Sequence, residues 1–166
     1  MLFLGIDPGT AVTGFGLIES ENTSRYQCID FGTIRSKSSE VQVGRLKKIY
    51  DGVTAVIEKY SPDVMALEDV FYGQNVQAAL KLGQARGVVI IAGLNAGVPV
   101  TTFAAREVKQ SLTGHGAASK EQVQRMVRDM LHLKEVINPL DASDALAIAL
   151  CHAQRWWTNQ KLKNIQ

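Results

Sequence analysis

The amino-acid sequence predicts an α/β fold in which helices flank a five-stranded mixed sheet, three antiparallel strands followed by parallel ones. A short apolar run at residues 2–6 stops at Asp7-Pro8-Gly9, as a buried strand ends at a turn. Two neighbouring segments then alternate apolar and polar residues, and a succession of strand, helix and strand comes later. Together these elements account for residues 1–166 as a single domain.

The first half of the chain supplies most of the sheet. Residues 12–19 and 26–34 alternate as hairpin strands do, and polar residues 21–24 form the turn. Apolar residues spaced three and four apart predict an amphipathic helix over residues 41–60. Apolar runs at 64–68 and 98–101, with a predicted helix at 75–95 between them, imply parallel strands joined by a right-handed crossover.

The second half is predicted to be helical. Helices are expected at residues 104–112, 120–131 and 142–157. Ser119 and Gln122 have the spacing of a capping box, so they mark the start of the second of these helices. Gly114-His115-Gly116 before it predicts a flexible connection.

Composition excludes several classes of protein. The sequence has no run of about 18 apolar residues, and its first apolar run meets an acid too soon for a signal peptide, so we expect a cytoplasmic protein without a membrane partner. A net charge of +2 is only mildly basic, so a nucleic-acid site must come from local clustering. Cys28 and Cys151 match no paired metal-ligand spacing and are expected to be reduced and structural, and no metal role is expected of His115, His132 or His152.

Four acids are candidates for a metal site. Asp7 and Glu68 each close a predicted strand, and carboxyl ends of neighbouring parallel strands meet at one edge of a sheet. Asp141 and Asp144 are three residues apart, so both project from one helix face towards that edge. Oxygen ligands suit Mg²⁺ or Mn²⁺, and two such ions would activate a water and stabilise the leaving oxygen in phosphodiester hydrolysis.

Each acid also has a simpler interpretation. Asp7 is a common turn former before proline and glycine, and Glu68 is a strand-terminal acid that solvent alone would satisfy. Asp141 and Asp144 suit a helix N-cap and first turn. The residues alone therefore leave a metal site and a purely structural role both open.

Four segments resemble the RuvC family of Holliday junction resolvases, in the order found in that family. They are GIDPGTAVTG at residues 5–14, LEDVF at 67–71, ALKLGQARG at 79–87 and DASDALAIA at 141–149. The resemblance implies a ribonuclease H-like fold and a homodimer that resolves four-way DNA junctions by paired symmetric nicks, in homologous recombination and DNA repair. It implies two Mg²⁺ ions per subunit, replaceable by Mn²⁺, on Asp7, Glu68, Asp141 and Asp144. It also implies a partner complex of the RuvA and RuvB type for branch migration.

The resemblance extends to candidate DNA contacts. Phe71 matches an aromatic residue of the family, which would stack on or wedge between opened bases, and Tyr72 lies beside it. Lys109 and Lys120 match basic positions associated with the scissile backbone, and Arg86 is a further candidate. Core packing for the aromatics and solvated helix faces for the basic residues are the alternatives. Other arginines that could contact phosphates are Arg106, Arg125 and Arg128.

The helix predicted at residues 75–95 carries small residues that allow another helix to approach closely. In the resembling family this helix contributes to the dimer contact, whereas the alternative is packing on the chain's own sheet. These residues are Ala78, Ala79, Gly83, Ala85 and Gly87.

Three rival functions remain. GIDPGT at residues 5–10 also resembles the phosphate-binding turn of the actin and sugar-kinase class, but no second acidic, glycine-rich hairpin follows between residues 104 and 166. A related nuclease acting on RNA would share the fold and the acids, although Phe71, Lys109 and Lys120 favour junction DNA. A catalytically silent junction-binding module is the third, and the intact set of four acids counts against it.

Overall fold

The computed structural model describes residues 1–69 and 75–163, and its centre is one mixed sheet. The five strands are β1 (Leu2–Asp7), β2 (Val12–Asn22), β3 (Arg25–Arg35), β4 (Val64–Glu68) and β5 (Val100–Phe103). Their order is β3-β2-β1-β4-β5, in which β2 runs antiparallel to both β1 and β3, while β4 runs parallel to β1 and β5. The predicted mixed sheet is therefore confirmed.

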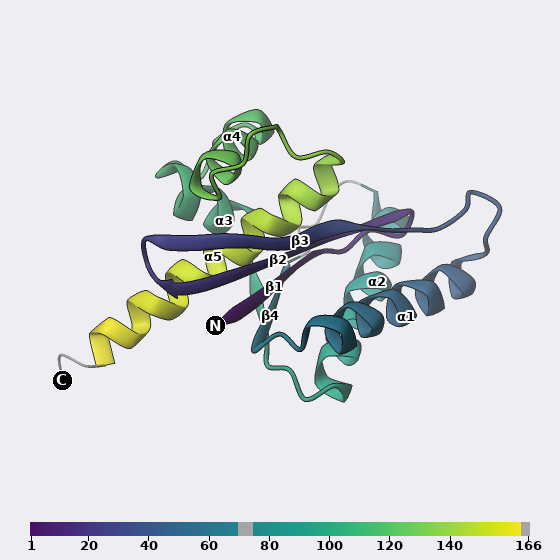
Figure 1. Ribbon diagram of the computed structural model, residues 1–166. Coiled ribbons are helices and arrows are strands. Elements are labelled where there is room, and N and C mark those ends of the chain that lie inside the picture. Colours follow the sequence, from purple (N-terminus) through teal and green to yellow (C-terminus); the bar gives the residue numbers. More distant parts are fainter. Residues whose placement is uncertain (70–74, 164–166) are drawn as a thin grey trace.

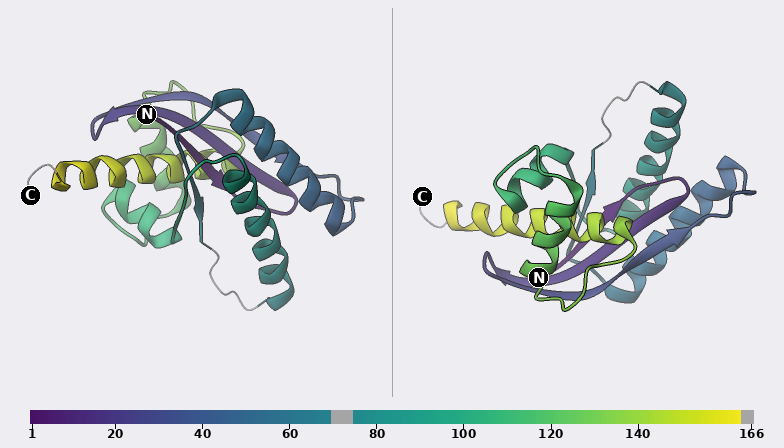
Figure 2. Two further views of the ribbon diagram at one scale, coloured as in Figure 1. Left: turned by 90° about the horizontal axis from the view of Figure 1, so that it is seen from below. Right: turned by 90° about the horizontal axis from the view of Figure 1, so that it is seen from above.

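Helices cover both faces of this sheet (Figures 1 and 2). They are α1 (Gln42–Tyr60), α2 (Val76–Asn95), α3 (Ala105–Thr113), α4 (Lys120–Met130) and α5 (Leu140–Lys163). The long helix α5 crosses the sheet on one face and carries α3 and α4 beside it, whereas α1 and α2 lie on the other face. In the described residues, no helix is both long and apolar enough to span a membrane.

Several predicted boundaries differ from the structure. Strand β2 runs on to Asn22 and β3 already begins at Arg25, so the turn predicted at residues 21–24 is reduced to residues 23–24. Strand β5 begins at Val100, two residues later than expected, because Pro99 has no N–H to donate to the ladder. Helix α5 is longer than predicted at both ends. Its first turn begins where the N–H groups of Ala142 and Ser143 donate to the carbonyl of Pro139, and at its far end Trp157 donates to the Ser20 hydroxyl at 3.0 Å. The Trp157 contact depends on tertiary packing, which periodicity does not reveal.

Alternating strand residues divide the interior into two cores. In β1, Phe3 packs with α3, α4 and α5, while its neighbour Leu4 packs with α1 and α2. In β4, Ala66 and Met65 divide in the same way, and all four side chains are fully buried. The period-two pattern of side chains along a strand thus lets one short sheet support both helical layers.

Helix α5 approaches the sheet so closely that glycine is required beneath it. A Cβ atom on Gly5 would lie 2.0 Å from the Ala145 carbonyl oxygen, and one on Gly16 would lie 2.6 Å from Leu146 Cγ. Gly5 and Gly16 face each other across the β1–β2 ladder. The glycine floor, defined here as Gly5, Gly14 and Gly16, therefore fixes the height of α5 above the sheet.

The burial of the His152 side chain should make the stability of the fold depend on pH. The side chain is 5% exposed and lies between the rings of Phe3 and Phe103, at centroid distances of 5.6 and 5.5 Å. Burial lowers the pKa of His152 to about 4, from the usual 6.5. Between these values the unfolded chain binds a proton that the folded chain does not, so stability is complete above pH 6.5 and falls as the pH is lowered.

We expect the wild-type chain to lose roughly 2 kcal/mol from this source between pH 6.5 and pH 5, a drop of several degrees in Tm. His152→Phe should keep a ring in the cavity and lose less Tm over that interval. His132→Asn, on an exposed residue with a φ of 52°, is the matched control. Thermal unfolding at a series of pH values tests the expectation, and identical acid slopes for His152→Phe and the wild type would contradict it.

Candidate active site

The first two candidate acids end adjacent parallel strands. The register of β1 and β4 pairs Ile6 with Leu67, so Asp7 and Glu68 come next at the carboxyl edge of the sheet. Each strand is apolar up to that point because it is buried on both faces, and each acid is only partly buried where the sheet ends. The predicted meeting of Asp7 and Glu68 at one edge is thus confirmed as geometry.

Helix α5 brings the other two acids to the same edge. Gly14 faces Asp7 across the β1–β2 ladder, and a Cβ atom on Gly14 would lie 2.0 Å from the Asp141 carbonyl oxygen. The first turn of α5 therefore lies directly over the end of the β1–β2 ladder at Asp7 and Gly14. Asp141 and Asp144 lie in that turn and the next one, and both are partly buried.

One pocket collects most of these side chains. Asp7, Glu68 and Asp144 line it together with Lys109 of α3 and Lys120 of α4. Its remaining wall is small or apolar and consists of Ala105, Val108, Val123 and Ala147. Asp141 does not line the pocket, although its charge reaches Asp7. Five elements that are distant in sequence thus contribute to one acidic pocket with two lysines at its wall.

The acids repel one another strongly. Burial and, in decreasing order, the negative charges of Asp144, Glu68 and Asp141 together raise the pKa of Asp7 to about 7, although Lys120 lowers it. Burial and Asp144 also raise the pKa of Glu68 above its usual value, while Lys120 and Lys109 lower it. A site that makes ionisation this costly favours any cation that would compensate the charge.

Lys120 is the cation nearest to the acids. Its Nζ lies 2.9 Å from Asp144 Oδ2, and this ion pair, with the nearby Asp7 and Glu68, raises the pKa of Lys120. Lys120 precedes Asp144 by 24 positions in the chain, so the packing of α4 against α5 brings this cation to the acids. The Lys120 side chain is 62% exposed, so it is free to exchange this partner for another anion.

The donor set fits hard divalent cations. Carboxylate oxygens are the ligands that Mg²⁺ and Mn²⁺ prefer, and the three acids that line the pocket outnumber its two lysines. Within residues 1–69 and 75–163, no three acidic, histidine or cysteine side chains already converge tightly enough to enclose an ion. Binding would therefore require small side-chain movements, including release of Asp144 by Lys120.

Arg86, a predicted DNA contact, has a partner within the protein. Its Nη2 lies 2.9 Å from Asp69 Oδ1, and its side chain is only 26% exposed. Asp69 follows Glu68, and its backbone N–H donates to the Phe103 carbonyl at 2.7 Å. Arg86 thus ties α2 to the end of β4, next to the pocket. Periodicity alone gave no signal for this contact, and DNA binding by Arg86 stays a prediction.

The other predicted DNA residues are placed differently. Lys109 and Lys120 lie at the pocket, whereas Phe71 and Tyr72 lie outside the described residues. Arg106 and Arg125 are exposed on α3 and α4, and Arg128 forms an ion pair with Asp129 at 2.7 Å.

Comparison with known proteins identifies close relatives. The family model for crossover junction endodeoxyribonuclease RuvC matches residues 3–152. The protein of that name from Geobacter sulfurreducens is 49% identical over 166 residues, which cover 100% of both chains. Its counterpart from Syntrophotalea carbinolica is 49% identical over 162 residues, which cover 98% of this chain and 99% of the other.

Solved structures agree with these relatives. Thermus thermophilus RuvC in complex with a Holliday junction substrate matches with a TM-score of 0.91 at 36% identity, covering 96% of each chain. The yeast mitochondrial Holliday junction resolvase Ydc2 matches with a TM-score of 0.65 at 12% identity, covering 96% of this chain and 81% of the other. At that identity the second match supports the fold alone, which is of the ribonuclease H type.

Proposed function

This chain belongs to the RuvC family of crossover junction endodeoxyribonucleases, and from that premise we propose that Asp7, Glu68, Asp141 and Asp144 form its catalytic centre. It is a hydrolase that resolves Holliday junctions. The observation that carries the proposal is the acidic pocket, in which carboxylates from β1, β4 and α5 meet two lysines at the open edge of the sheet. Such an arrangement suits the binding of a phosphodiester and its hydrolysis by water.

Nucleases of this family depend on metal ions, and we propose Mg²⁺, with Mn²⁺ as a substitute, at two positions per subunit. When bound, the ions activate the attacking water and stabilise the leaving oxygen of the phosphodiester. Asp7 lies between β4 and α5, so it would hold cations together with Glu68 on one side and with Asp141 and Asp144 on the other. The apolar wall beneath the carboxylates excludes bulk water and strengthens their interaction with cations.

We assign Lys120 and Lys109 to the scissile phosphate. Lys120 holds Asp144 in the free protein, and a phosphate entering with cations would take over that ammonium group. Lys109, on α3, reaches the same pocket and lowers the pKa of Glu68. Both lysines would then donate to phosphate oxygens as negative charge develops there.

We expect Lys109→Ala and Lys120→Ala each to weaken junction binding and to flatten its salt dependence by about one unit of slope for each lost phosphate contact. Fluorescence anisotropy with a labelled junction over a series of salt concentrations measures the slope. Lys59→Ala, on an exposed residue at the end of α1, provides the matched control and should keep the wild-type slope. A lysine variant with the same slope as this control does not contact the DNA.

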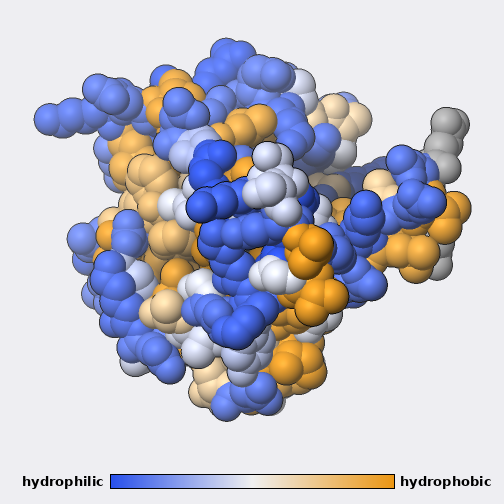
Figure 3. Space-filling model, turned by 90° about the vertical axis from the view of Figure 1, so that its right-hand side faces the viewer, coloured by the Kyte–Doolittle hydropathy of each residue, from blue (hydrophilic) through white to orange (hydrophobic). Residues whose placement is uncertain are grey.

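We propose that the working enzyme is a homodimer joined through α1 and α2. Val43, Leu46, Tyr50, Val88 and Ile91 line an apolar groove between these helices. Val43 is 77% and Ile91 is 50% exposed, although both are large apolar residues. Hydrophobic surface is visible among hydrophilic side chains on this side of the molecule (Figure 3). Exposed apolar surface of this kind is typical of an interface, and a second copy would also supply the second nick.

The small residues of α2 divide between the two roles considered for them. Ala85 is fully buried against the chain's own core. Gly83 and Gly87, by contrast, have no atom of the described residues, apart from the adjacent backbone of their own helix, within 4 Å of the position of an added Cβ atom. These two glycines leave room for a helix of the partner, which supports the same interface.

We therefore expect the wild type to scatter light as a dimer at micromolar concentration, and Ile91→Glu to scatter as a monomer, because a charge would be buried in the contact. The control Leu162→Glu alters an apolar residue that is 59% exposed near the C-terminal end of α5, and it should leave the dimer intact. A dimeric Ile91→Glu protein, or a monomeric wild type, would argue against this interface. With dimerisation lost, nicks on the two strands should no longer be paired.

We further propose a cytoplasmic site of action in homologous recombination and DNA repair, with a branch-migration complex of the RuvA and RuvB type as partner. The decisive test is incubation of the purified protein with a labelled four-way junction, a linear duplex and a structured RNA, each with and without Mg²⁺. Metal-dependent, symmetric nicking of the junction alone is expected. Cleavage of RNA in preference, or binding without cleavage, would favour the rival functions.

A further inference from the structure

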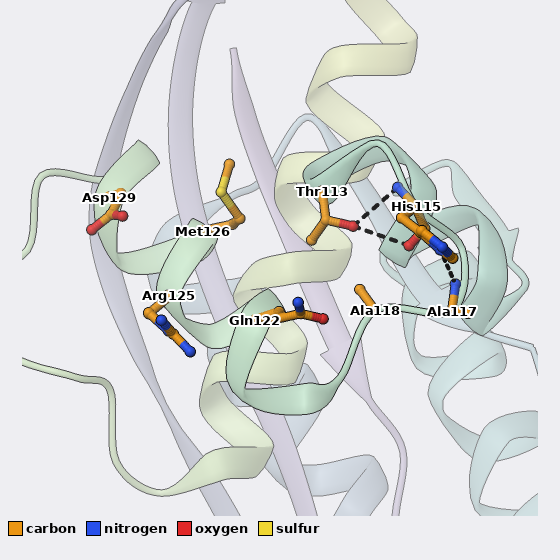
Figure 4. A pocket seen from close by; sticks show the side chains of 8 residues that line it. All are labelled: Thr113, His115, Ala117, Ala118, Gln122, Arg125, Met126 and Asp129. Atoms are coloured by element: carbon orange, nitrogen blue, oxygen red, sulfur yellow. Dashed lines mark hydrogen bonds between the residues drawn. The ribbon is translucent and has the colours of Figure 1, made fainter.

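The connection between α3 and α4 carries a second charged site outside the acidic pocket. Two hollows meet at His115: Gln122 and Arg125 line one with it, and Arg106 and Gln110 line the other. Figure 4 shows the first hollow, with Arg125 on α4 at one side and His115 at the other. None of the four proposed catalytic acids lines either hollow.

This connection is held in one conformation by side-chain hydrogen bonds, although the sequence suggested flexibility. The Gln110 amide donates through Nε2 to the Gly114 carbonyl at 2.6 Å and accepts from the Gly116 N–H at 2.9 Å. The Thr113 hydroxyl accepts from the His115 N–H at 3.2 Å. A ligand that binds here meets a preformed surface, so little ordering entropy opposes binding.

His115 presents a fixed donor to solvent. Its Nδ1 accepts a hydrogen bond of 3.0 Å from the Ala117 N–H, which is drawn as a dashed line in Figure 4. The proton of the neutral imidazole therefore lies on Nε2, and that atom can donate to an acceptor outside the protein. The residue is exposed, so the donor is accessible.

Two arginines give the site an excess of positive charge. Gly116 makes room for Arg106, because a Cβ atom there would lie 2.6 Å from Arg106 Cγ and 3.1 Å from its Nε. Among the described residues, the ion pairs found involve neither Arg106 nor Arg125. Asp129, the acid that lines the hollow with Arg125, is already paired with Arg128 at 2.7 Å. The hollows thus favour an anion.

The position of this site indicates which anion it binds. Arg106 and Lys109 are three residues apart on α3, so they are neighbours on its surface, and Lys109 lines the acidic pocket. We propose that Arg106, His115 and Arg125 bind the sugar–phosphate backbone of the junction arm beside the cleaved phosphate. This assignment rests on the proposed function, since it takes the acidic pocket as the point of cleavage.

Binding experiments with single variants test the site. Arg106→Gln, Arg125→Gln and His115→Asn each remove a donor, and Asn can still accept the Ala117 N–H through Oδ1, so the connection should keep its conformation. We expect Arg106→Gln and Arg125→Gln each to flatten the salt dependence of junction binding by about 0.9 units of slope for each lost phosphate contact, whereas His115→Asn, which removes a neutral donor, should weaken binding without changing the slope. Arg25→Gln removes an exposed charge at the tip of the β2–β3 hairpin, at the far end of the sheet, and should not change the slope.

Uncharged phosphate analogues in the DNA can identify which phosphate the proposed site contacts. Replacing single phosphates of the cleaved strand by methylphosphonates should weaken wild-type binding at the contacted position, and the same replacement should weaken the His115→Asn or Arg106→Gln protein less. Slopes of Arg106→Gln and Arg125→Gln equal to that of Arg25→Gln, or losses that add independently at every phosphate, would overturn the site. A wild-type protein that cuts junctions normally alongside either result leaves the proposed function intact, whereas one that binds no junction overturns both.

Discussion

Asp7→Asn should reduce junction cleavage by roughly a hundredfold or more while leaving junction binding intact. Asparagine keeps the shape of the side chain and one carbonyl oxygen but loses the charge that would position cations between β1, β4 and α5. Metal positioning contributes several kcal/mol of transition-state stabilisation, and each 1.36 kcal/mol is a factor of ten in rate. Single-turnover cleavage of a labelled four-way junction in Mg²⁺ measures the loss.

The same substitution should not harm the fold. Because the pKa of Asp7 is raised to about 7 in the folded chain, the folded state binds more protons than the unfolded state between about pH 4 and 7. Stability from this group is therefore present at low pH and is lost as the pH rises through 7. Without divalent ions at pH 8, Asp7→Asn should melt at the wild-type temperature or above it.

Two further measurements, the effect of Mg²⁺ on Tm and the activity of a control variant, test the role of Asp7 in metal binding. Mg²⁺ should raise the Tm of the wild type, since a ligand of the folded state stabilises it, and should raise that of Asp7→Asn much less. Glu21→Gln removes one negative charge at the hairpin tip, with a side chain 68% exposed, and should cut junctions normally. A folded Asp7→Asn protein that cuts junctions at close to the wild-type rate would show Asp7 to be only a turn former.

Gly5→Ala should strongly destabilise this fold, although it adds only a single methyl group. Its Cβ atom would lie 2.0 Å from the Ala145 carbonyl oxygen and 2.7 Å from the Ala149 nitrogen, so the backbone of α5 must move. Overpacking of a rigid core costs about 1–3 kcal/mol, and contact with helix backbone on both sides favours the upper end or beyond. Moving α5 also moves Asp141 and Asp144 away from Asp7, so cleavage should fall even below the melting temperature.

Chemical denaturation and thermal melting measure the first effect, and cleavage well below Tm measures the second. Gly44→Ala in α1 is the matched control, because its Cβ atom would meet only Val41 Cγ2, at 4.0 Å. Alanine favours a helix over glycine by about 0.5–1 kcal/mol, so this variant should be slightly more stable than the wild type. If Gly5→Ala and Gly44→Ala unfold at the same denaturant concentration, the glycine floor does not set the position of α5.

Much of this fold could be predicted from local patterns. The hairpin, the parallel crossover and the five helices follow from periodicity and turn residues, and Ser119 with Gln122 forms the predicted capping box at 2.8 and 3.3 Å. The meeting of Asp7 with Glu68 also followed, because parallel strands share an edge. Each of these features depends on a short stretch of sequence or on a general rule of sheet topology.

What could not be predicted depends on contacts between distant segments. The Lys120 ion pair with Asp144 joins residues 24 positions apart, and the ion pair of Arg86 with Asp69 joins α2 to the residue that follows β4. Nothing in the sequence around Gly14 indicates that this residue lies beneath Asp141. Such contacts are set by how elements pack, and no local pattern specifies them.

The acidic pocket draws its carboxylates from the first strand, the fourth strand and the last helix, and this order has a consequence during protein synthesis. A ribosome must add 137 further residues after Asp7 before Asp144 exists, and α5 can settle on the sheet only after that. The same helix fills the core on one face, so completion of the fold and assembly of the acidic pocket are one event. A nascent or truncated chain that lacks α5 therefore lacks Asp141 and Asp144, two of the four acids of the proposed catalytic centre. The proposed centre can assemble only after the last helix has been synthesised.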